Sequence, residues 1–268
     1  MRCSASSLPG SWSSRIPFDM FEHPDRRRIY LLRHAEAAYV DVDGNVVDDT
    51  RSVGLTIYGE EQARRQAEVL ANVEFDRAIC SGLPRTVATA GFVLEGRSHP
   101  HLEIVGALEE IQGGDGQAPG ADLAAWLDHV ANPWADADHP EARFLGGERF
   151  ADFEARVVPA FRDLLAAQDW RTLLLVAHGG VNRVILNHVM NLSWHGGLSV
   201  EQDACCINII DVDRKAGAVS RFLVRGINIT GYNLNKAGIT LTDMERAAER
   251  IASAQDDVPV EATDKRER

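Results

Sequence analysis

The chain has 268 residues, of which 45% are hydrophobic and 25% are charged, and its formal net charge is −12 from 28 Lys and Arg against 40 Asp and Glu. An acidic chain lacks the basic face that holds a nucleic-acid backbone, so nucleic acid is excluded as a general partner. A few arginines could still form a local pocket for a small phosphate. The length and composition predict one large soluble domain with tails.

The four cysteines show neither disulfide nor zinc-site spacing, and the adjacent pair Cys205 and Cys206 is typical of a buried strand. We therefore expect a reducing, cytoplasmic setting. No apolar run approaches the roughly 20 residues that cross a bilayer, so no membrane partner is expected. Residues 1–28 contain Arg, Ser and Pro without a continuous apolar stretch, which predicts a flexible extension rather than a secretory signal.

The first half of the chain alternates short apolar runs with helical patterns. The apolar run at 29–32 is typical of a buried parallel strand. Thr56 is a plausible helix N-cap, and Pro84 fits the first turn of a helix. In order, we predict a strand at 29–32, a loop at 41–54, a helix ending near residue 70, a strand at 77–80 and a helix at 84–94.

The second half continues this alternation after an insertion at about 112–147 that is rich in Gly, Pro, Asp and Ala. The run at 173–177 is the strongest strand signal of the chain. In order, we predict a weak strand at 102–108, a helix at 121–130, a helix at 148–167, the strand at 173–177, a helix to about 190, strands at 204–212 and 220–225, and an amphipathic helix from about 240. The tail after Gln255 is predicted to be disordered.

Alternating strands and helices predict an α/β fold, a three-layer sandwich with a mostly parallel sheet covered by helices on both faces and the small insertion as a lid. The domain runs from 29 to 240. It is flanked by the extension at 1–28 and by a C-terminal helix and tail at 241–268, for which we expect a surface or partner-facing role.

Polar side chains follow three of the predicted strands at the point where each strand ends. They are Arg33 and His34, then Ser81 with Arg85, then His178 with Gly179. Ligands of open α/β sheets bind at this carboxyl edge, so we expect two histidines and two arginines to meet there.

Two histidines beside two arginines are suited to phosphate chemistry. Guanidinium groups hold the oxygens of a phosphoryl dianion, and a neutral imidazole can attack phosphorus. Nearby Arg33 and Arg85 would lower the pKa of His34 and keep it unprotonated near neutral pH. The helix N-termini after Pro84 and Gly179 would add backbone N–H donors.

At these residues the sequence resembles the histidine phosphatase superfamily, the phosphoglycerate-mutase-like group. The matching pieces occur in the family's order over about residues 29–225. They are Leu32-Arg33-His34-Ala35-Glu36, Leu55-Thr56-x-x-Gly59-x-x-Gln62-Ala63, Ser81-x-Leu83-x-Arg85-Thr86-x-x-Thr89-Ala90, Leu108-x-Glu110-Ile111 and Val176-x-His178-Gly179-Gly180.

The resemblance implies a role for each matched residue. His34 takes the phosphoryl group, while Arg33, Arg85, His178 and Gly179 hold the phosphate. Glu110 would protonate the leaving oxygen and then activate water, although a shift of one position would give this role to Glu109. The catalytic set is thus His34, Glu110 and His178, and no metal or organic cofactor is expected.

Three positions depart from the family pattern. Ala35 stands where the family has glycine, Ala37 where it has a hydroxyl residue, and Val40 where it often has asparagine. The phosphate pocket is therefore expected to hold fewer donors than usual.

Three functions remain open. A metal-independent phosphatase of phosphate monoesters is favoured over a phosphoglycerate-type mutase, because residues 111–142 contain no Lys or Arg to hold a second anionic group. The third is a catalytically weak phosphate-binding pseudoenzyme. The expected partner is a small phosphorylated substrate whose leaving group is not strongly anionic, and a homodimer is left open. Trp126 and Trp134 could line the substrate cavity or pack the insertion.

Overall fold

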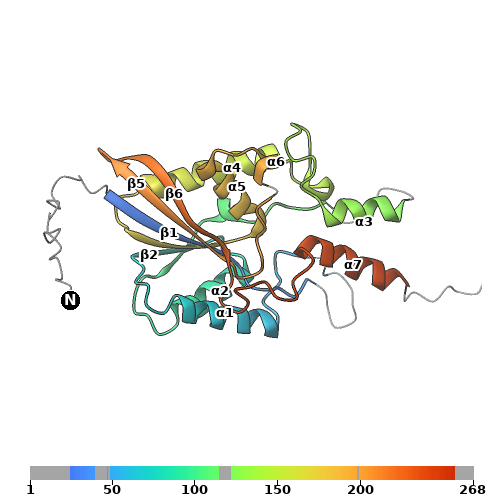
Figure 1. The fold of residues 1–268 in the computed structure, drawn as a ribbon, viewed down its shortest axis with the longest axis horizontal. Coiled ribbons are helices and arrows are strands. Elements are labelled where there is room, and N and C mark those ends of the chain that lie inside the picture. Colours follow the sequence, from blue (N-terminus) through green and yellow to red (C-terminus); the bar gives the residue numbers. More distant parts are fainter. Residues whose placement is uncertain (1–24, 40–46, 48, 115–121, 198, 257–268) are drawn as a thin grey trace, which may run out of the picture.

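The computed structural model describes residues 25–39, 47, 49–114, 122–197 and 199–256 (Figure 1). A six-stranded mixed sheet with the order β3-β2-β4-β1-β5-β6 lies between helices on both faces. The predicted α/β fold class is confirmed.

The elements follow one another in the predicted alternation. The strands are β1 (Asp25–Arg33), β2 (Arg77–Cys80), β3 (Leu102–Ile104), β4 (Thr172–Ala177), β5 (Ile207–Lys215) and β6 (Ala218–Ile229). The helices are α1 (Ile57–Val69), α2 (Pro84–Leu94), α3 (Leu123–Ala131), α4 (Phe150–Ala166), α5 (Gly179–Met190), α6 (Trp194–Gly197) and α7 (Asp243–Asp256). Two short 3-10 turns are found at Gly106–Leu108 and Phe144–Gly146.

Four neighbouring strands, β3, β2, β4 and β1, run parallel, so their carboxyl ends share one edge of the sheet. Strand β4 lies between β1 and β2, which do not pair with each other. On the other side of β1, strand β5 is antiparallel to β1 and β6 is antiparallel to β5.

The central strand β4 has apolar side chains on both faces, as buried parallel strands do. Leu173 and Leu175 pack into the core beneath α4 and α5. Leu174 and Val176 point to the opposite face and pack with side chains of α1 and α2. Packing on both faces therefore fixes the position of the sheet edge at which the polar strand ends lie.

Strands β1 and β3 differ from the predictions. Strand β1 begins at Asp25 and pairs with β5 from its first residue, so residues 25–28 belong to the sheet and not to an extension. The predicted third strand is shorter, because after Ile104 the chain turns into the 3-10 turn. The rest of the predicted extension, 1–24, lies outside the described residues. The tail predicted after Gln255 begins with Asp256, which ends α7, and its remaining residues, 257–268, also lie outside the described residues.

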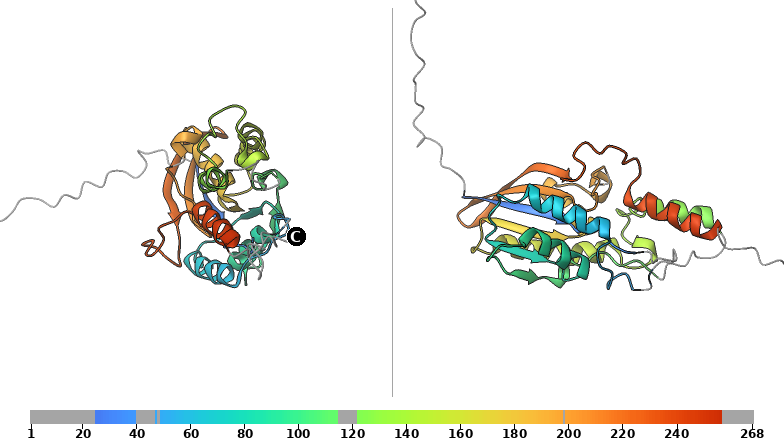
Figure 2. Two further views of the ribbon diagram at one scale, coloured as in Figure 1. Left: turned by 90° about the vertical axis from the view of Figure 1, so that its right-hand side faces the viewer. Right: turned by 90° about the horizontal axis from the view of Figure 1, so that it is seen from below.

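Helices α3 and α7 pack against each other although they are far apart in sequence. They lie side by side beyond the carboxyl end of β1 (Figures 1 and 2). The described part of the insertion and the C-terminal helix therefore lie together beyond the carboxyl edge of the sheet, where open α/β sheets bind their ligands.

None of the described helices is both long and apolar enough to cross a membrane.

Candidate active site

The carboxyl ends of four parallel strands deliver the predicted site residues to one edge. His34 follows β1, Arg85 lies in the first turn of α2 after β2, Glu110 follows the turn after β3, and His178 follows β4. Strands β1 and β4 are neighbours in parallel register, with Arg33 opposite Ala177. This register puts the two histidines side by side, with ring centroids 5.1 Å apart.

His34 is 3% exposed, and its backbone is fixed by hydrogen bonds to Ala177 and Cys205. Its Nδ1 lies 2.7 Å from the carbonyl oxygen of Ala35. A carbonyl only accepts, so Nδ1 carries the proton and Nε2 keeps its lone pair in the neutral ring. The local geometry thus presents Nε2 as the free nitrogen.

Both histidines are held in the neutral form. Burial, followed by the charges of Arg33 and Arg85, lowers the pKa of His34 well below its ordinary value of 6.5. Burial, His34 and the two arginines lower the pKa of His178 in the same direction. An unprotonated imidazole beside two cations is the arrangement that a nucleophile toward phosphate needs.

Three buried nitrogens of this cluster have no hydrogen-bond partner among the described residues: Nε of Arg33, Nε of Arg85 and Nδ1 of His178. The rest of the Arg85 guanidinium is anchored, because Nη1 donates to the carbonyl of Thr50 at 2.9 Å. Buried polar atoms without partners are uncommon in folded proteins. An anion with several acceptor oxygens, placed beside Nε2 of His34, would satisfy both guanidinium groups.

Ser81 orients His178, a contact that sequence reasoning did not assign. Its Oγ lies 2.8 Å from Nε2 of His178 and 3.0 Å from the hydroxyl of Thr86. The hydroxyl of Thr86 donates in turn to the carbonyl of Leu83. A chain of two hydroxyls therefore fixes the ring of His178 from the side opposite its unpartnered Nδ1.

Glu110, rather than Glu109, reaches the site. One carboxylate oxygen of Glu110 accepts from the N–H of Gly180 at 3.0 Å, in the first turn of α5, and the other from the N–H of Ile111. Glu109 points away and pairs with Arg51. A methyl group on Gly180 would lie 2.4 Å from the Glu110 carboxylate, so the glycine makes this close approach to α5 sterically feasible.

The turn that carries Glu110 is held by Arg156 of α4. Its guanidinium donates to the backbone carbonyls of Ala107, Glu109 and Glu110 at 2.8–3.1 Å. The other side of the same group pairs with Glu148. Sequence reasoning missed Arg156, because a helical arginine facing three carbonyls gives no local signal.

Two of the three departures from the family pattern, Ala35 and Ala37, lie beside the site rather than in it. The methyl of Ala35 packs into a small apolar cluster with Ala63 and Cys205. Ala37 forms an isolated bridge with Leu55. Val40 lies outside the described residues. The Ala35 methyl therefore takes no space from a phosphate.

The motif at 55–63 supports the His34 turn. Thr56 caps α1 and its hydroxyl also donates to the carboxylate of Glu36 at 2.9 Å. A methyl on Gly59 would lie 2.1 Å from the Glu36 carbonyl, so α1 approaches this turn as closely as only glycine permits. The side chain of Gln62 accepts from the N–H of Glu36.

One acidic residue at the site was not predicted. Asp243, the first residue of α7, pairs with Arg33 through one carboxylate oxygen and with Arg246 through the other. Although burial alone would raise it, the pKa of Asp243 is lowered by these two arginines. The C-terminal helix, for which a surface or partner-facing role is predicted, thus also contacts a residue of the candidate site.

The two tryptophans of the insertion differ in burial. Trp134 is 9% exposed, stacks on Trp194 with ring centroids 5.8 Å apart and belongs to the main hydrophobic core of the domain. Trp126 lies half-buried on α3. Within the described part of the chain, no three His, Cys, Asp or Glu side chains are grouped so that they could hold a metal ion.

Known proteins share this fold. A putative alpha-ribazole-5'-P phosphatase from Escherichia coli superposes with a TM-score of 0.60 at 27% identity, covering 75% of this chain and 96% of that one. A mycobacterial glucosyl-3-phosphoglycerate phosphatase gives a TM-score of 0.61 at 24% identity, which supports the fold.

Curated sequences agree. The adenosylcobalamin/alpha-ribazole phosphatase of Salmonella typhimurium is 31% identical over 198 residues, or 69% of this chain and 90% of that protein. A 2,3-bisphosphoglycerate-dependent phosphoglycerate mutase of Rhizobium etli is 28% identical over 187 residues, or 65% of this chain and 85% of that protein. The model of the histidine phosphatase superfamily, branch 1, matches residues 29–224, which include both histidines and both arginines of the site. The chain belongs to the histidine phosphatase superfamily.

Proposed function

We propose that this protein is a phosphatase that hydrolyses phosphate monoesters through a phosphohistidine on His34. The observation that carries the proposal is the free Nε2 of a buried, neutral His34 beside unpartnered guanidinium nitrogens of Arg33 and Arg85. Relatives with phosphatase names, such as the alpha-ribazole phosphatase at 31% identity, support hydrolysis as the outcome.

In the first step, the lone pair of Nε2 attacks phosphorus while the bond between phosphorus and the ester oxygen breaks. Arg33 and Arg85 hold the phosphoryl oxygens and stabilise their charge, and the N-terminus of α5 at Gly179 adds its dipole. Glu110 donates its proton to the leaving oxygen, which departs as an alcohol.

In the second step, water attacks the phosphorus of the phosphohistidine. The carboxylate of Glu110 accepts a proton from this water, and the P–N bond breaks and returns its electron pair to Nε2. Inorganic phosphate is released, and the chain is again in its starting state.

A trapping experiment tests this proposal. The purified chain is incubated with an aryl phosphate, quenched in alkali, in which phosphohistidine survives, and digested for mass spectrometry. We expect phosphate on His34 and steady release of inorganic phosphate. His34→Gln should lose both, whereas the same change at the exposed His101 should lose neither. A folded chain with neither adduct nor release would support the binding-protein alternative instead.

The mutase alternative is motivated by relatives such as the one from Rhizobium etli. Among the described residues of the insertion, 122–142 carry no Lys or Arg. Helix α7 does bring Arg246 toward the site, but Asp243 pairs with it and with Arg33. Hydrolysis is therefore preferred, with a leaving group that is not strongly anionic. Faster turnover of phosphoglycerates or sugar bisphosphates than of neutral phosphate esters would contradict this preference.

A further inference from the structure

Arg33 is held from one side only. Its Nη1 donates to the carbonyl oxygen of Gln202 at 2.6 Å and also pairs with the carboxylate of Asp243. The Nε atom, on the opposite edge of the planar guanidinium, is buried and has no partner among the described residues. It lies beside Gly179, where an added methyl would be 3.4 Å away.

This pattern separates the two edges of the guanidinium. Nε and Nη2 form a fork that matches two oxygens of a phosphate. The two acceptors that the described residues supply both occupy Nη1 and leave this fork without a partner among them. Because these two acceptors hold Nη1, the fork of Nε and Nη2 faces the first turn of α5. Arg33 is therefore already oriented to bind a phosphate beside His34.

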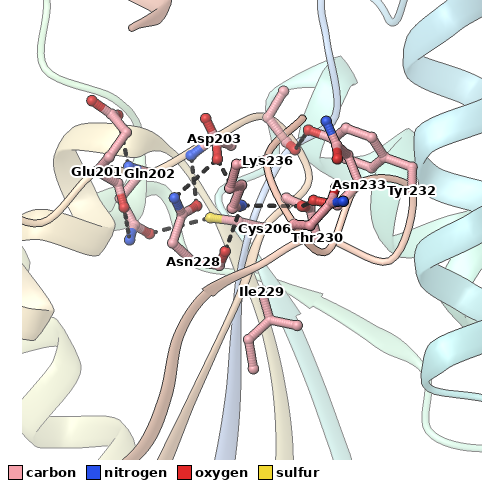
Figure 3. Close-up of polar contacts among 12 residues, drawn as sticks. Glu201, Gln202, Asp203, Cys206, Asn228, Ile229, Thr230, Tyr232, Asn233 and Lys236 are labelled. Carbon is pink, nitrogen blue, oxygen red and sulfur yellow. Dashed lines mark hydrogen bonds and ion pairs between the residues drawn. The ribbon is translucent and has the colours of Figure 1, made fainter. Parts of the chain in front are cut away.

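The segment that leads into α7 is fixed to the same loop that supplies the Gln202 carbonyl. The ammonium of Lys236 donates to the carboxylate of Asp203 at 2.7 Å, the carbonyl of Asn228 at 2.7 Å and the hydroxyl of Thr230 at 3.0 Å (Figure 3). The hydroxyl of Tyr232 donates to the carbonyl of Ala204. Asp203 is 5% exposed and the Lys236 side chain 33%, so this anchor is partly buried and fixes the segment that precedes α7.

Helix α7 is also held on its far side, because it packs against α3 of the insertion. The helix lies beyond residue 224, where the family match ends. Asp243 therefore lies on a C-terminal helix, α7, that is fixed by the anchor at Lys236 and by its packing against α3.

We propose that Asp243 is a positioning residue, which with the Gln202 carbonyl orients Arg33 for the substrate phosphate, so that helix α7 is a working part of the site. The inference rests on the proposed function, because it assigns a role toward the same phosphate. Asp243 touches Arg33 and not the reacting atoms. Its main effect on the phosphate should therefore pass through Arg33.

The test compares Asp243→Asn, which keeps the shape and removes the charge, with Glu249→Gln on the exposed side of α7 as the matched control. Binding of inorganic phosphate is measured by calorimetry, and kcat and KM are measured with an aryl phosphate. We expect Asp243→Asn to weaken phosphate binding about tenfold and to lower kcat/KM by about tenfold to a hundredfold. Glu249→Gln should match the wild-type chain in both.

The same substitution in an Arg33→Lys background separates positioning from a general structural role. If Asp243 acts through Arg33, Asp243→Asn should change phosphate binding there by less than about twofold. An equal loss in both backgrounds, or phosphate binding as tight as wild type or tighter in Asp243→Asn alone, would overturn the proposal. If Asp243→Asn fails to fold, Asp243→Glu replaces it, with a smaller expected loss.

The calorimetric result distinguishes this inference from the proposed function. A wild-type chain that binds phosphate but releases none from the ester contradicts the proposed function, and the comparison of the Asp243 variants still decides the positioning role. A wild-type chain that hydrolyses the ester but binds no phosphate measurably leaves the proposed function standing, and kcat/KM of the Asp243 variants then decides the positioning role.

Discussion

The ring of His34 combines an Nδ1–H donated to the Ala35 carbonyl with a pKa lowered by burial, Arg33 and Arg85. Because the lowered pKa lies below 6.5, the ring should stay neutral in the folded chain when free histidine is already protonated. Nitrogen NMR of the free protein should show the Nδ1–H tautomer of His34 at pH 6. A protonated ring at that pH, or the opposite tautomer, would contradict the assignment of Nε2 as the nucleophile.

Ser81 should affect turnover through the orientation of His178. In Ser81→Ala the Nε2 of His178 loses its hydroxyl partner and the ring is free to rotate, so we expect kcat to fall about tenfold. The exposed Ser253→Ala, which removes a hydroxyl from α7, is the control and should leave kcat unchanged. Unfolding in urea checks that both chains keep their fold, and an unaltered kcat in folded Ser81→Ala would show that the hydroxyl does not orient His178.

Several residues that meet at the candidate site could be placed there from the sequence, because they follow strands within short motifs. His34 and His178 are examples, since each ends an apolar run. Asp243 could not, because its partner Arg33 is 210 positions away in the sequence and the ion pair depends on where α7 packs. The position of the Ala35 methyl was equally hidden, because the sequence does not say to which side of the turn it points.

At the scale of single elements, Gly180 in the first turn of α5 leaves room for the Glu110 carboxylate. Gly180→Ala should move the Glu110 carboxylate, because the new methyl would lie 2.4 Å from its oxygen and 3.1 Å from the Trp134 ring. We expect kcat to fall about tenfold or more. On α2, Gly91 has no atom within 4 Å of the added methyl, so Gly91→Ala should keep kcat and raise the free energy of unfolding by about 0.5–1 kcal/mol. Equal kcat values in the two variants would remove the steric explanation.

The buried strands were the most predictable elements, and the outer ones the least. Strands β2 and β4 begin or end within one residue of their predicted bounds, because both of their faces are apolar. Strand β5 is shifted three residues toward the C-terminus relative to its prediction, and β6 is longer than predicted, since charged pairs interrupt their hydrophobic pattern. Asp211 is fully buried in β5 and pairs with Arg28 on one side and Arg225 on the other, a stabilising contact that sequence periodicity does not reveal.

For the whole molecule, two buried neutral histidines predict sensitivity to acid. The pKa values of His34 and His178 are lowered in the folded chain, so below pH 6.5 the unfolded chain binds protons that the folded chain does not. As the pH decreases below 6.5, the free energy of unfolding should therefore decrease as well, by about 1.4 kcal/mol per pH unit for each histidine. Arginine-paired carboxylates act at lower pH, since Arg26 and Arg221 lower the pKa of Asp213 from 3.8 to about 2.

Urea unfolding between pH 7.5 and 5 measures this slope. In His34→Gln one of these groups is removed, while His178 and His188, whose pKa values burial also lowers, remain. The slope should therefore fall by the share of His34, at most about 1.4 kcal/mol per pH unit, whatever the variant does to absolute stability. A slope unchanged by the substitution would show that His34 has the same affinity for protons in the folded and unfolded chains.

The position of β4 between β1 and β2 bears on how the chain is made. Strands β1 and β2 emerge from the ribosome first, yet neither has its shared neighbour until Thr172–Ala177 has been synthesised. Until then the apolar side chains of both strands and their unpaired backbone edges stay open to other chains. Translation of about 90 residues between β2 and β4 takes several seconds at 5–20 residues per second, so this is the interval in which a nascent chain most needs a chaperone.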